Sequence, residues 1–277
     1  MLKKLIMAAL RLRLNLLAVF SKRRAGQLAY KIFTTPRKGA LRTQDLEFLK
    51  TAQWADTELR GLKIQYYAWE NPGPTVLMAH GWESNSARWK SLIKRLLNAG
   101  FRVVAIDAPA HGGSGSLQFS AVLYGEFIGV LVDLLKPDYA VGHSGGGLAI
   151  GYHLENRPDT SLKKAAILGA PSTLRGILDR YTIGAGISAA ARKGLDDAIL
   201  EKFGKPVEYF SLEDYAGRFH IPGLIIHDEG DATAPIEEAE RLHRHWKGSQ
   251  LVRTQGLGHS LQGAAVFEAV LGFLQRA

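Results

Sequence analysis

A serine between glycines is the strongest chemical signal in the sequence. The run Gly142–Gly146 has the letters G-H-S-G-G and fits G-x-S-x-G, with a β-rich run before it and a helical pattern after it. In this strand–turn–helix context Ser144 becomes an exposed nucleophile. The glycines permit a tight turn, so we expect a strained backbone at Ser144. A phosphate-binding turn is the alternative, but neither a P-loop lysine nor the G-x-G-x-x-G spacing is present here.

A serine hydroxyl needs a general base, and the base needs an anionic group to orient it. His259 follows the last β-rich run on a glycine-flexed loop and is the candidate base. Asp231 follows another apolar run and is the candidate acid, with Asp228 and Glu229 as rivals in the same loop. The order serine, aspartate, histidine is the one expected when the nucleophile lies on a strand-to-helix turn. We therefore predict Ser144, Asp231 and His259 as the catalytic residues.

A His-Gly-Trp turn supplies a further part of such a site. His80, Gly81 and Trp82 follow the β-rich run Thr75–Ala79. The backbone N–H groups of Trp82 and Gly145 are the predicted oxyanion hole, because a helix N-terminus directs such groups at developing negative charge. We expect no metal and no organic cofactor, and without cysteine there is no thiol nucleophile. The sequence singles out no further substrate-binding residue.

These residues lie on loops that an alternating β and α pattern must position. The β-rich runs from Thr75 onward are almost continuously apolar, as expected of strands covered on both faces. The alternation predicts an α/β fold with a doubly wound, mostly parallel sheet. The predicted strands are Leu62–Trp69, Thr75–Ala79, Arg102–Ile106, Tyr139–Gly142, Ala165–Leu168, Leu224–His227 and Gln250–Arg253. The predicted helices include Arg88–Ala99, Ala121–Leu135, Leu148–Glu155, Ile236–Trp246 and Ala264–Leu274.

One stretch interrupts this alternation. Residues Ser172 to about His220 are rich in glycine and alanine and mostly helical in pattern, without a clear strand. We predict that they form a helical cap inserted between two strands. A chain of 277 residues is long enough for one large domain with a small insertion. The expected organisation is a basic helical segment over residues 1–45 and an α/β domain over residues 46–277, with the cap at about 172–220.

The N-terminal segment carries the basic charge of the chain. Eleven Lys and Arg precede the first acidic residue, Asp45, whereas the remaining residues have a formal charge of −2 within a total of +9. A nucleic-acid-binding protein is expected to spread basic charge over its folded surface, so we expect no nucleic-acid partner.

Residues 2–22 have the pattern of an amphipathic helix, with Lys4, Arg11, Asn15 and Lys22 on one side and Leu5, Ile6, Ala9, Leu12, Leu16, Leu17 and Phe20 on the other. Arg11 and Arg13 interrupt the apolar stretch. Because of this interruption, we expect neither a membrane span nor a signal peptide here. Packing on the body of the protein is one interpretation. Peripheral contact of residues 2–24 with an anionic membrane is another, and a basic presequence is a third.

These motifs together resemble the α/β-hydrolase superfamily, and more closely its esterase, lipase and peptidase-like branch. The resemblance covers roughly residues 62–277. Two positions depart from the superfamily's pattern, Ala110 in the loop Asp107–Gly115 and Asp228 in the acid turn, where glycine is usual. We assign the loop mainly a structural role, with a direct contact to the substrate as the alternative. Serine at position 144 argues against the aspartate-nucleophile branches, the haloalkane dehalogenases and epoxide hydrolases. The resemblance places the site under the inserted cap.

The residues and the resemblance predict a cytoplasmic serine hydrolase. Its substrate would be an ester, thioester or amide of a small molecule or an acyl chain, cleaved through a Ser-His-Asp triad and an acyl-enzyme. The alternative is a catalytically inactive protein that keeps the α/β-hydrolase fold for binding or for membrane docking.

Overall fold

The computed structural model describes residues 2–276, which form two compact units. We call residues 36–172 together with 212–276 the sheet unit, and residues 2–35 together with 173–211 the helical unit. The sequence predicts an N-terminal segment and a cap as two separate parts. In the structure, the N-terminal helices and the inserted helices form one unit.

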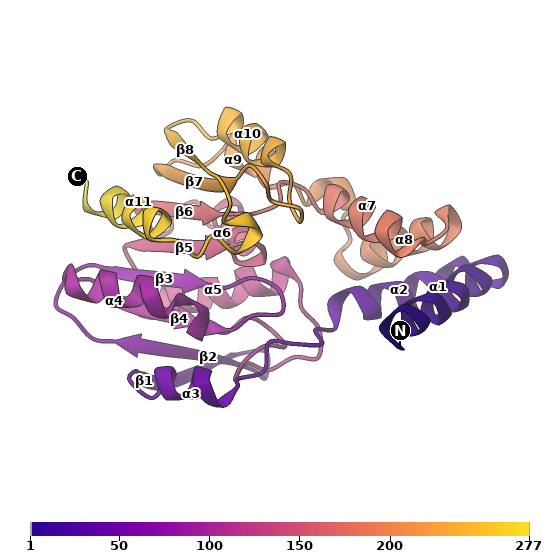
Figure 1. Ribbon diagram of the computed structural model, residues 1–277, viewed down its shortest axis with the longest axis horizontal. Helices are drawn as coiled ribbons and strands as arrows, with labels where there is room; N and C mark the ends of the chain where they lie inside the picture. The colour runs from indigo at the N-terminus through magenta and orange to yellow at the C-terminus, as the bar shows by residue number, and fades with distance from the viewer. Residues whose placement is uncertain (1, 277) are drawn as a thin grey trace. The chain divides into compact units, whose positions relative to one another are not determined.

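The sheet unit contains a mostly parallel sheet, which confirms the predicted fold class (Figure 1). Its described strands follow the order β1-β2-β4-β3-β5-β6-β7-β8. The pairs β1–β2 and β2–β4 are antiparallel, and the other neighbouring strands are parallel. The bounds are β1 Gln53–Leu59, β2 Leu62–Trp69, β3 Thr75–Ala79, β4 Arg102–Ile106, β5 Tyr139–His143, β6 Lys164–Leu168, β7 Gly223–Asp228 and β8 Ser249–Thr254.

Seven of these strands match the predicted β-rich runs, whereas β1 was missed. The reason is its composition: it is a half-exposed edge strand in which Gln53 and residues 56–58 are polar, and it has no continuous apolar run. Such a strand depends on pairing with β2 rather than on a buried face of its own.

Helices cover both faces of the sheet because successive residues of the central strands point to opposite sides. Along β3, Val76 and Met78 pack in one hydrophobic cluster and Leu77 and Ala79 in the other. The first cluster lies under α3 (Thr43–Leu49), η1 (Ser86–Trp89), α4 (Lys90–Asn98) and α11 (Ala264–Gln275). The second lies under α5 (Ala121–Leu135), α6 (Gly145–Asn156), α9 (Leu212–Ala216) and α10 (Ile236–His245).

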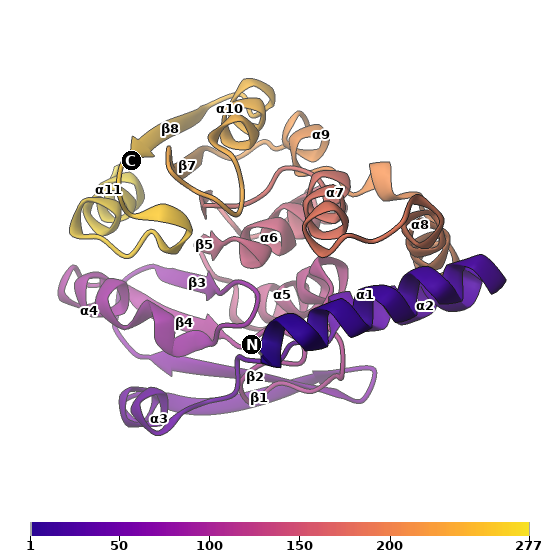
Figure 2. The ribbon, with the colours of Figure 1, turned by 45° about the vertical axis from the view of Figure 1, so that its right-hand side comes forward.

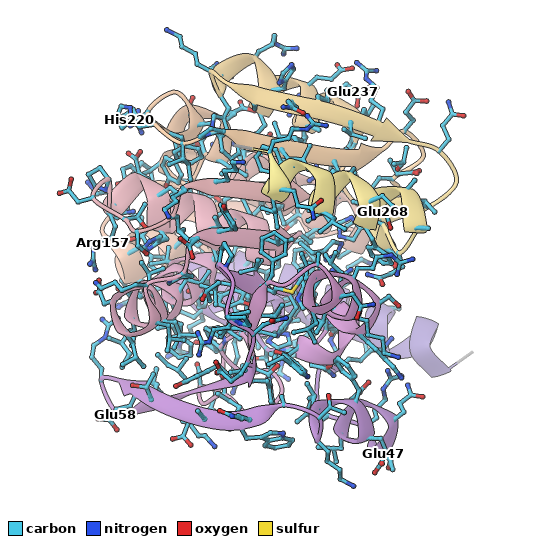
Figure 3. All side chains as sticks on the ribbon, turned by 90° about the vertical axis from the view of Figure 1, so that its left-hand side faces the viewer. Glu47, Glu58, Arg157, His220, Glu237 and Glu268 are labelled. Atoms are coloured by element: carbon cyan, nitrogen blue, oxygen red, sulfur yellow. The ribbon has the colours of Figure 1, made fainter. Side chains whose placement is uncertain are left out.

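Charged side chains mark the outside of these layers. Figure 3 shows Glu47, Glu58, Arg157, Glu237 and Glu268 pointing away from the sheet, and each of them is exposed. The carboxyl ends of β3, β4, β5, β7 and β8 meet at one edge of the sheet, because their ladder is parallel. The loops that carry the predicted site residues follow these ends.

The helical unit has its own small core. It consists of α1 (Leu2–Phe20), α2 (Lys22–Thr34), α7 (Leu174–Ala185), α8 (Ala189–Phe203) and η2 (Val207–Tyr209). Helix α1 runs beside α2, and both contact α8 (Figure 2). Their shared core contains Leu14, Ala29, Tyr30, Leu178, Leu195, Ile199 and Val207. None of the described helices combines the length and the apolar content needed to cross a bilayer.

The side of α1 that packs differs from the predicted apolar side. Leu14 and Ala18 are buried, whereas Leu12, Leu16 and Phe20 are exposed. The helix ends at Phe20, and the Ser21 side chain then accepts a hydrogen bond from Arg24 N–H to begin α2. Periodicity identified the helix, but only the partners α2 and α8 determine which apolar stripe faces inward.

Helices α2 and α8 approach so closely that only glycine fits at their crossing. A Cβ placed on Gly26 would lie 1.8 Å from the carbonyl oxygen of Gly194.

We expect Gly26→Ala to lower the free energy of unfolding by about 1–3 kcal/mol or more, because the backbone of α8 cannot move aside as a flexible side chain would. Gly184→Ala in α7, where a Cβ meets open space, is the matched control and should be neutral or stabilise by up to about 1 kcal/mol. Urea unfolding followed by far-UV circular dichroism measures both, and equal stability of the two variants would contradict the close packing.

His153 on α6 should make the fold acid-sensitive. Its side chain is buried beside Thr160, and burial together with the nearby Arg157 cation lowers its pKa from 6.5 to about 4. The unfolded chain therefore binds a proton at His153 below about pH 6.5, whereas the folded chain binds it only below about pH 4. The stability that comes from neutral His153 is complete above pH 6.5 and is lost as pH falls.

Between pH 6.5 and pH 5 this one group should account for about 2 kcal/mol of lost unfolding free energy. His153→Gln should lose correspondingly less over that interval in urea titrations, and the exposed His245→Gln serves as the control. A wild-type slope that His153→Gln leaves unchanged would contradict the assignment.

Candidate active site

Ser144 lies at a sharp turn between β5 and α6. Its backbone has φ 51° and ψ −116°, so the strained conformation expected from the sequence is confirmed. Glycine is required beside it: a Cβ on Gly146 would lie 2.1 Å from the carbonyl oxygen of Ala79, and one on Gly142 would lie 2.8 Å from Gly146. The Ser144 N–H donates to the Leu168 carbonyl at 2.9 Å. The turn is thus hydrogen-bonded to β6 and lies close against the end of β3.

The imidazole of His259 lies between a hydroxyl and a carboxylate. Its Nε2 is 3.0 Å from Ser144 Oγ, and its Nδ1 is 2.7 Å from Asp231 Oδ2. His259 is in the short helix η3 (Gly258–Ser260), and two glycines that precede it in the chain, Gly256 and Gly258, have positive φ. These left-handed positions turn the chain back over the sheet edge. The structure therefore brings together the three residues predicted from the sequence.

The rival acids of the same loop serve other contacts. Asp228 accepts hydrogen bonds from the N–H groups of Gly230 and Leu257 and from the Thr254 hydroxyl. Glu229 contacts Gln255 and Arg253. Asp228 thus ties the turn after β7 to the loop after β8 and leaves Asp231 as the carboxylate that reaches His259.

Hydrogen bonds keep the Asp231 carboxyl ionised. Burial raises its pKa, but the bonds from His259 and from the N–H groups of Ala234 and Thr233 outweigh burial and hold the pKa below its ordinary value. Its Oδ1 accepts from both N–H groups, so Oδ2 is directed at His259 Nδ1. An ionised acceptor on Nδ1 favours the tautomer in which Nε2 can accept the serine proton.

The His-Gly-Trp turn lies against Ser144, as the oxyanion-hole prediction requires. A Cβ on Gly81 would lie 2.9 Å from Ser144 Cβ, and one on Gly145 would lie 3.6 Å from the backbone nitrogen of Trp82. The Trp82 nitrogen and the first N–H of α6 are therefore neighbours beside the serine. The first N–H groups of a helix have no partner within the helix, so the Gly145 N–H is available to a bound group.

His80 locks this turn to the loop after β4. It is fully buried, and burial places its pKa well below the ordinary value, so the ring is neutral. Its Nδ1 donates to the Gly81 carbonyl at 2.8 Å, and its Nε2 accepts the Ala108 N–H at 2.9 Å. In that loop, the buried Asp107 carboxylate accepts hydrogen bonds from the Tyr67 hydroxyl and from Ser86, so it ties the loop to β2 and η1.

Two residues that sequence reasoning did not assign to the site hold the backbone around His259. His143 Nε2 bonds the His259 carbonyl at 2.7 Å, and an Arg88 nitrogen donates to the Ser260 carbonyl at 3.0 Å. Burial lowers the pKa of His143 well below its ordinary value, so a neutral ring donates this bond. Proximity to Ser144 was the available signal for His143, whereas no local pattern marks Arg88.

An aromatic side chain forms one wall beside the turn. The ring of Phe119 lies 5.4 Å from that of Trp82 and 5.6 Å from that of His111, between ring centres. A Cβ on Gly145 would lie 3.0 Å from Phe119. In the sequence, Phe119 could have been noticed as an apolar residue directly before Ser120, the residue whose side chain caps the N-terminus of α5. The Phe119 ring thus lies beside the first residue of α6, next to Ser144 in the chain.

Known proteins share this fold and its sequence pattern. A sequence profile of the "Alpha/beta hydrolase family" matches residues 76–270. The "Bifunctional esterase/perhydrolase DCH" of Acinetobacter calcoaceticus is 31% identical over 115 residues, which are 40% of this chain and 42% of that protein. The match thus spans less than half the length of this relative. The "Pimeloyl-[acyl-carrier protein] methyl ester esterase" of Neisseria meningitidis is 24% identical over 239 residues, 70% of this chain and 91% of that protein.

A solved structure gives the same fold. The esterase EaEST from Exiguobacterium antarcticum superposes with a TM-score of 0.63 at 19% identity, covering 81% of this chain and 100% of that one. The profile match extends over most of the chain and includes the turn at Ser144, the acid loop and His259. The chain therefore belongs to the α/β-hydrolase family.

Proposed function

We propose that the protein is a serine hydrolase of the carboxylesterase or lipase-like type. The observation that carries the proposal is the unbroken hydrogen-bonded chain from Asp231 through His259 to Ser144, with distances of 2.7 and 3.0 Å. Carboxylate, imidazole and hydroxyl in this order are what nucleophilic catalysis by serine requires.

In the first half of the reaction, His259 Nε2 takes the proton of Ser144 as Oγ attacks the substrate carbonyl carbon. The carbonyl oxygen becomes an oxyanion, and the N–H groups of Trp82 and Gly145 stabilise it. Asp231 stabilises the imidazolium that forms. The bond to the leaving group then breaks, and the leaving group departs with the proton from His259, so that an acyl group remains on Oγ.

In the second half, water replaces the leaving group. His259 removes a proton from the water, the hydroxide attacks the acyl carbon, and the same N–H groups stabilise the second oxyanion. Collapse of this intermediate returns the proton from His259 to Ser144 Oγ and releases the carboxylic acid. His259 therefore acts alternately as base and acid, and Asp231 stays ionised throughout.

The substrate class we propose is an ester, thioester or amide of a small molecule or an acyl chain. Two kinds of support exist: the relatives named as esterases, and the apolar wall of Phe119 beside the turn. An apolar acyl portion would contact this ring while the carbonyl lies at the Trp82 and Gly145 N–H groups.

Ser144→Ala tests the nucleophile. We expect p-nitrophenyl ester hydrolysis to fall at least roughly 10³-fold, because only transition-state stabilisation by the oxyanion hole remains. A panel of esters with increasing acyl length, run on the wild type, gives the chain-length preference. A fluorophosphonate probe should label Ser144 in the wild type and leave Ser144→Ala unlabelled. Folded wild-type protein that neither labels nor hydrolyses any ester would favour the catalytically inactive binding protein.

Asp231→Asn and Asp228→Asn form a matched pair that tests the acid. Asp231→Asn should lower kcat roughly 10⁴-fold, because an amide cannot stabilise the imidazolium and permits the wrong tautomer. Asp228→Asn should act mainly on thermal stability, because Asp228 holds the loops by hydrogen bonds and does not touch His259. Steady-state kinetics and melting curves for both variants separate the effects. A folded Asp228→Asn protein that is as inactive as Asp231→Asn would contradict the assignment.

A further inference from the structure

An apolar stripe of α1 faces outward. Leu12, Leu16, Val19 and Phe20 are 60%, 52%, 78% and 85% exposed. Their positions, i, i+4, i+7 and i+8, lie along one side of a helix. The inward side is provided by Leu14 and Ala18, which pack in the cores of the helical unit. The outward stripe is thus not needed for the packing of α1.

The charge of the protein is concentrated in the same unit. The helical unit has fourteen Lys and Arg against five Asp and Glu, a formal charge of +9, whereas the sheet unit has twenty-one of each. Residues 1–35 contain no acidic residue. Arg11 and Arg13 are exposed on α1, and Lys22 and Arg24 are exposed two and four residues after Phe20. Cations therefore border the apolar stripe.

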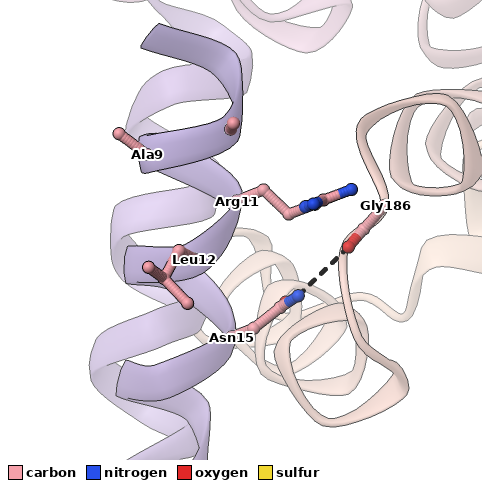
Figure 4. A pocket seen from close by; sticks show the side chains of 6 residues that line it. Ala9, Arg11, Leu12, Asn15 and Gly186 are labelled. Atoms are coloured by element: carbon pink, nitrogen blue, oxygen red, sulfur yellow. Dashed lines mark hydrogen bonds between the residues drawn. The ribbon is translucent and has the colours of Figure 1, made fainter. Parts of the chain in front are cut away.

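An open depression adjoins the stripe at Leu12. It has a volume of about 680 Å³ and is lined by Ala8, Ala9, Arg11, Leu12, Asn15 and Gly186. In Figure 4, Arg11 extends toward Gly186, and Asn15 donates to the Gly186 carbonyl at 3.1 Å. Asn15 also accepts the Ser188 N–H at 2.8 Å, so the loop after α7 is held in place. A guanidinium beside small apolar side chains is suited to an anionic group at an apolar boundary.

We propose that this face of α1 docks the protein onto a bilayer that contains anionic phospholipid. The side chains of Leu12, Leu16, Val19 and Phe20 enter the acyl boundary, and the bordering cations contact the headgroups. A second copy of the chain fits less well, because a symmetric contact across this face would oppose Arg13, Lys22 and Arg24 to other cations. The helix lies in the interface, which agrees with the absence of a spanning stretch among the described residues.

The test uses the full chain and sedimented vesicles. Wild type should bind vesicles of phosphatidylcholine with about 30% phosphatidylglycerol and bind pure phosphatidylcholine more weakly, and salt should weaken the binding. Val19→Ser/Phe20→Ser should lower the partition coefficient roughly tenfold or more. Lys22→Glu/Arg24→Glu should remove the preference for anionic vesicles. Leu134→Ser, at an exposed leucine of α5, is the matched control and should bind as the wild type does.

The outcomes distinguish this proposal from its competitors and from the proposed reaction. Wild type that stays in the supernatant with every vesicle, or Val19→Ser/Phe20→Ser that binds as wild type does, overturns membrane docking. A dimer by light scattering that Val19→Ser/Phe20→Ser makes monomeric, without vesicle binding, assigns the stripe to a second copy instead. Ser144→Ala should bind vesicles normally, so failure of the hydrolase assignment leaves this result unaffected.

Discussion

The hydrogen bond between Asp231 and His259 joins two loops that leave neighbouring strands, and the site depends on it. An ionised carboxylate 2.7 Å from Nδ1 fixes the orientation of the ring, and Nε2 is then 3.0 Å from Ser144 Oγ. Parallel pairing makes this possible, because β5, β7 and β8 release their loops at one edge of the sheet. The second oxygen of the Asp231 carboxylate accepts hydrogen bonds from the N–H groups of Thr233 and Ala234, and these bonds fix the orientation of the carboxylate. Small displacements of either loop would break the chain of contacts.

Buried neutral histidines hold the loops around Ser144 in place. His80 donates to one turn and accepts from another, His111 does the same between Pro109 and Glu83, and His143 bonds the carbonyl of His259. Burial lowers the pKa of all three, and a neutral imidazole is the side chain that offers one donor and one acceptor at opposite sides of a rigid ring. A protonated ring would lose its acceptor, so the low pKa values and the bridging geometry depend on each other.

The sequence was most informative where structure is locally determined. The elbow at Ser144 needs glycine at fixed offsets, and apolar runs mark strands that are covered on both faces, so both could be predicted. Asp231 was preferred over Asp228 from its place in the loop, but only the fold shows which carboxylate reaches His259. Edge strand β1 has no buried face, so its sequence shows no apolar pattern that would predict a strand. Arg88 was missed, and the sequence left open whether the predicted apolar side of α1 faces the protein or a membrane, because partners far along the chain determine which side packs.

The return of the chain at the base of the insertion has a further consequence. The Leu212 N–H donates to the Ser172 carbonyl at 2.7 Å, and the Leu174 N–H donates to the Phe210 carbonyl at 2.9 Å. Backbone hydrogen bonds therefore join the two ends of the inserted segment at the point where the chain leaves and re-enters the sheet unit. A segment with closely spaced ends can be exchanged for another without altering the register of β6 and β7. Because the inserted helices share a core with α1 and α2, evolution, or an engineer, would have to replace these helices together, and the reacting groups could then keep their geometry.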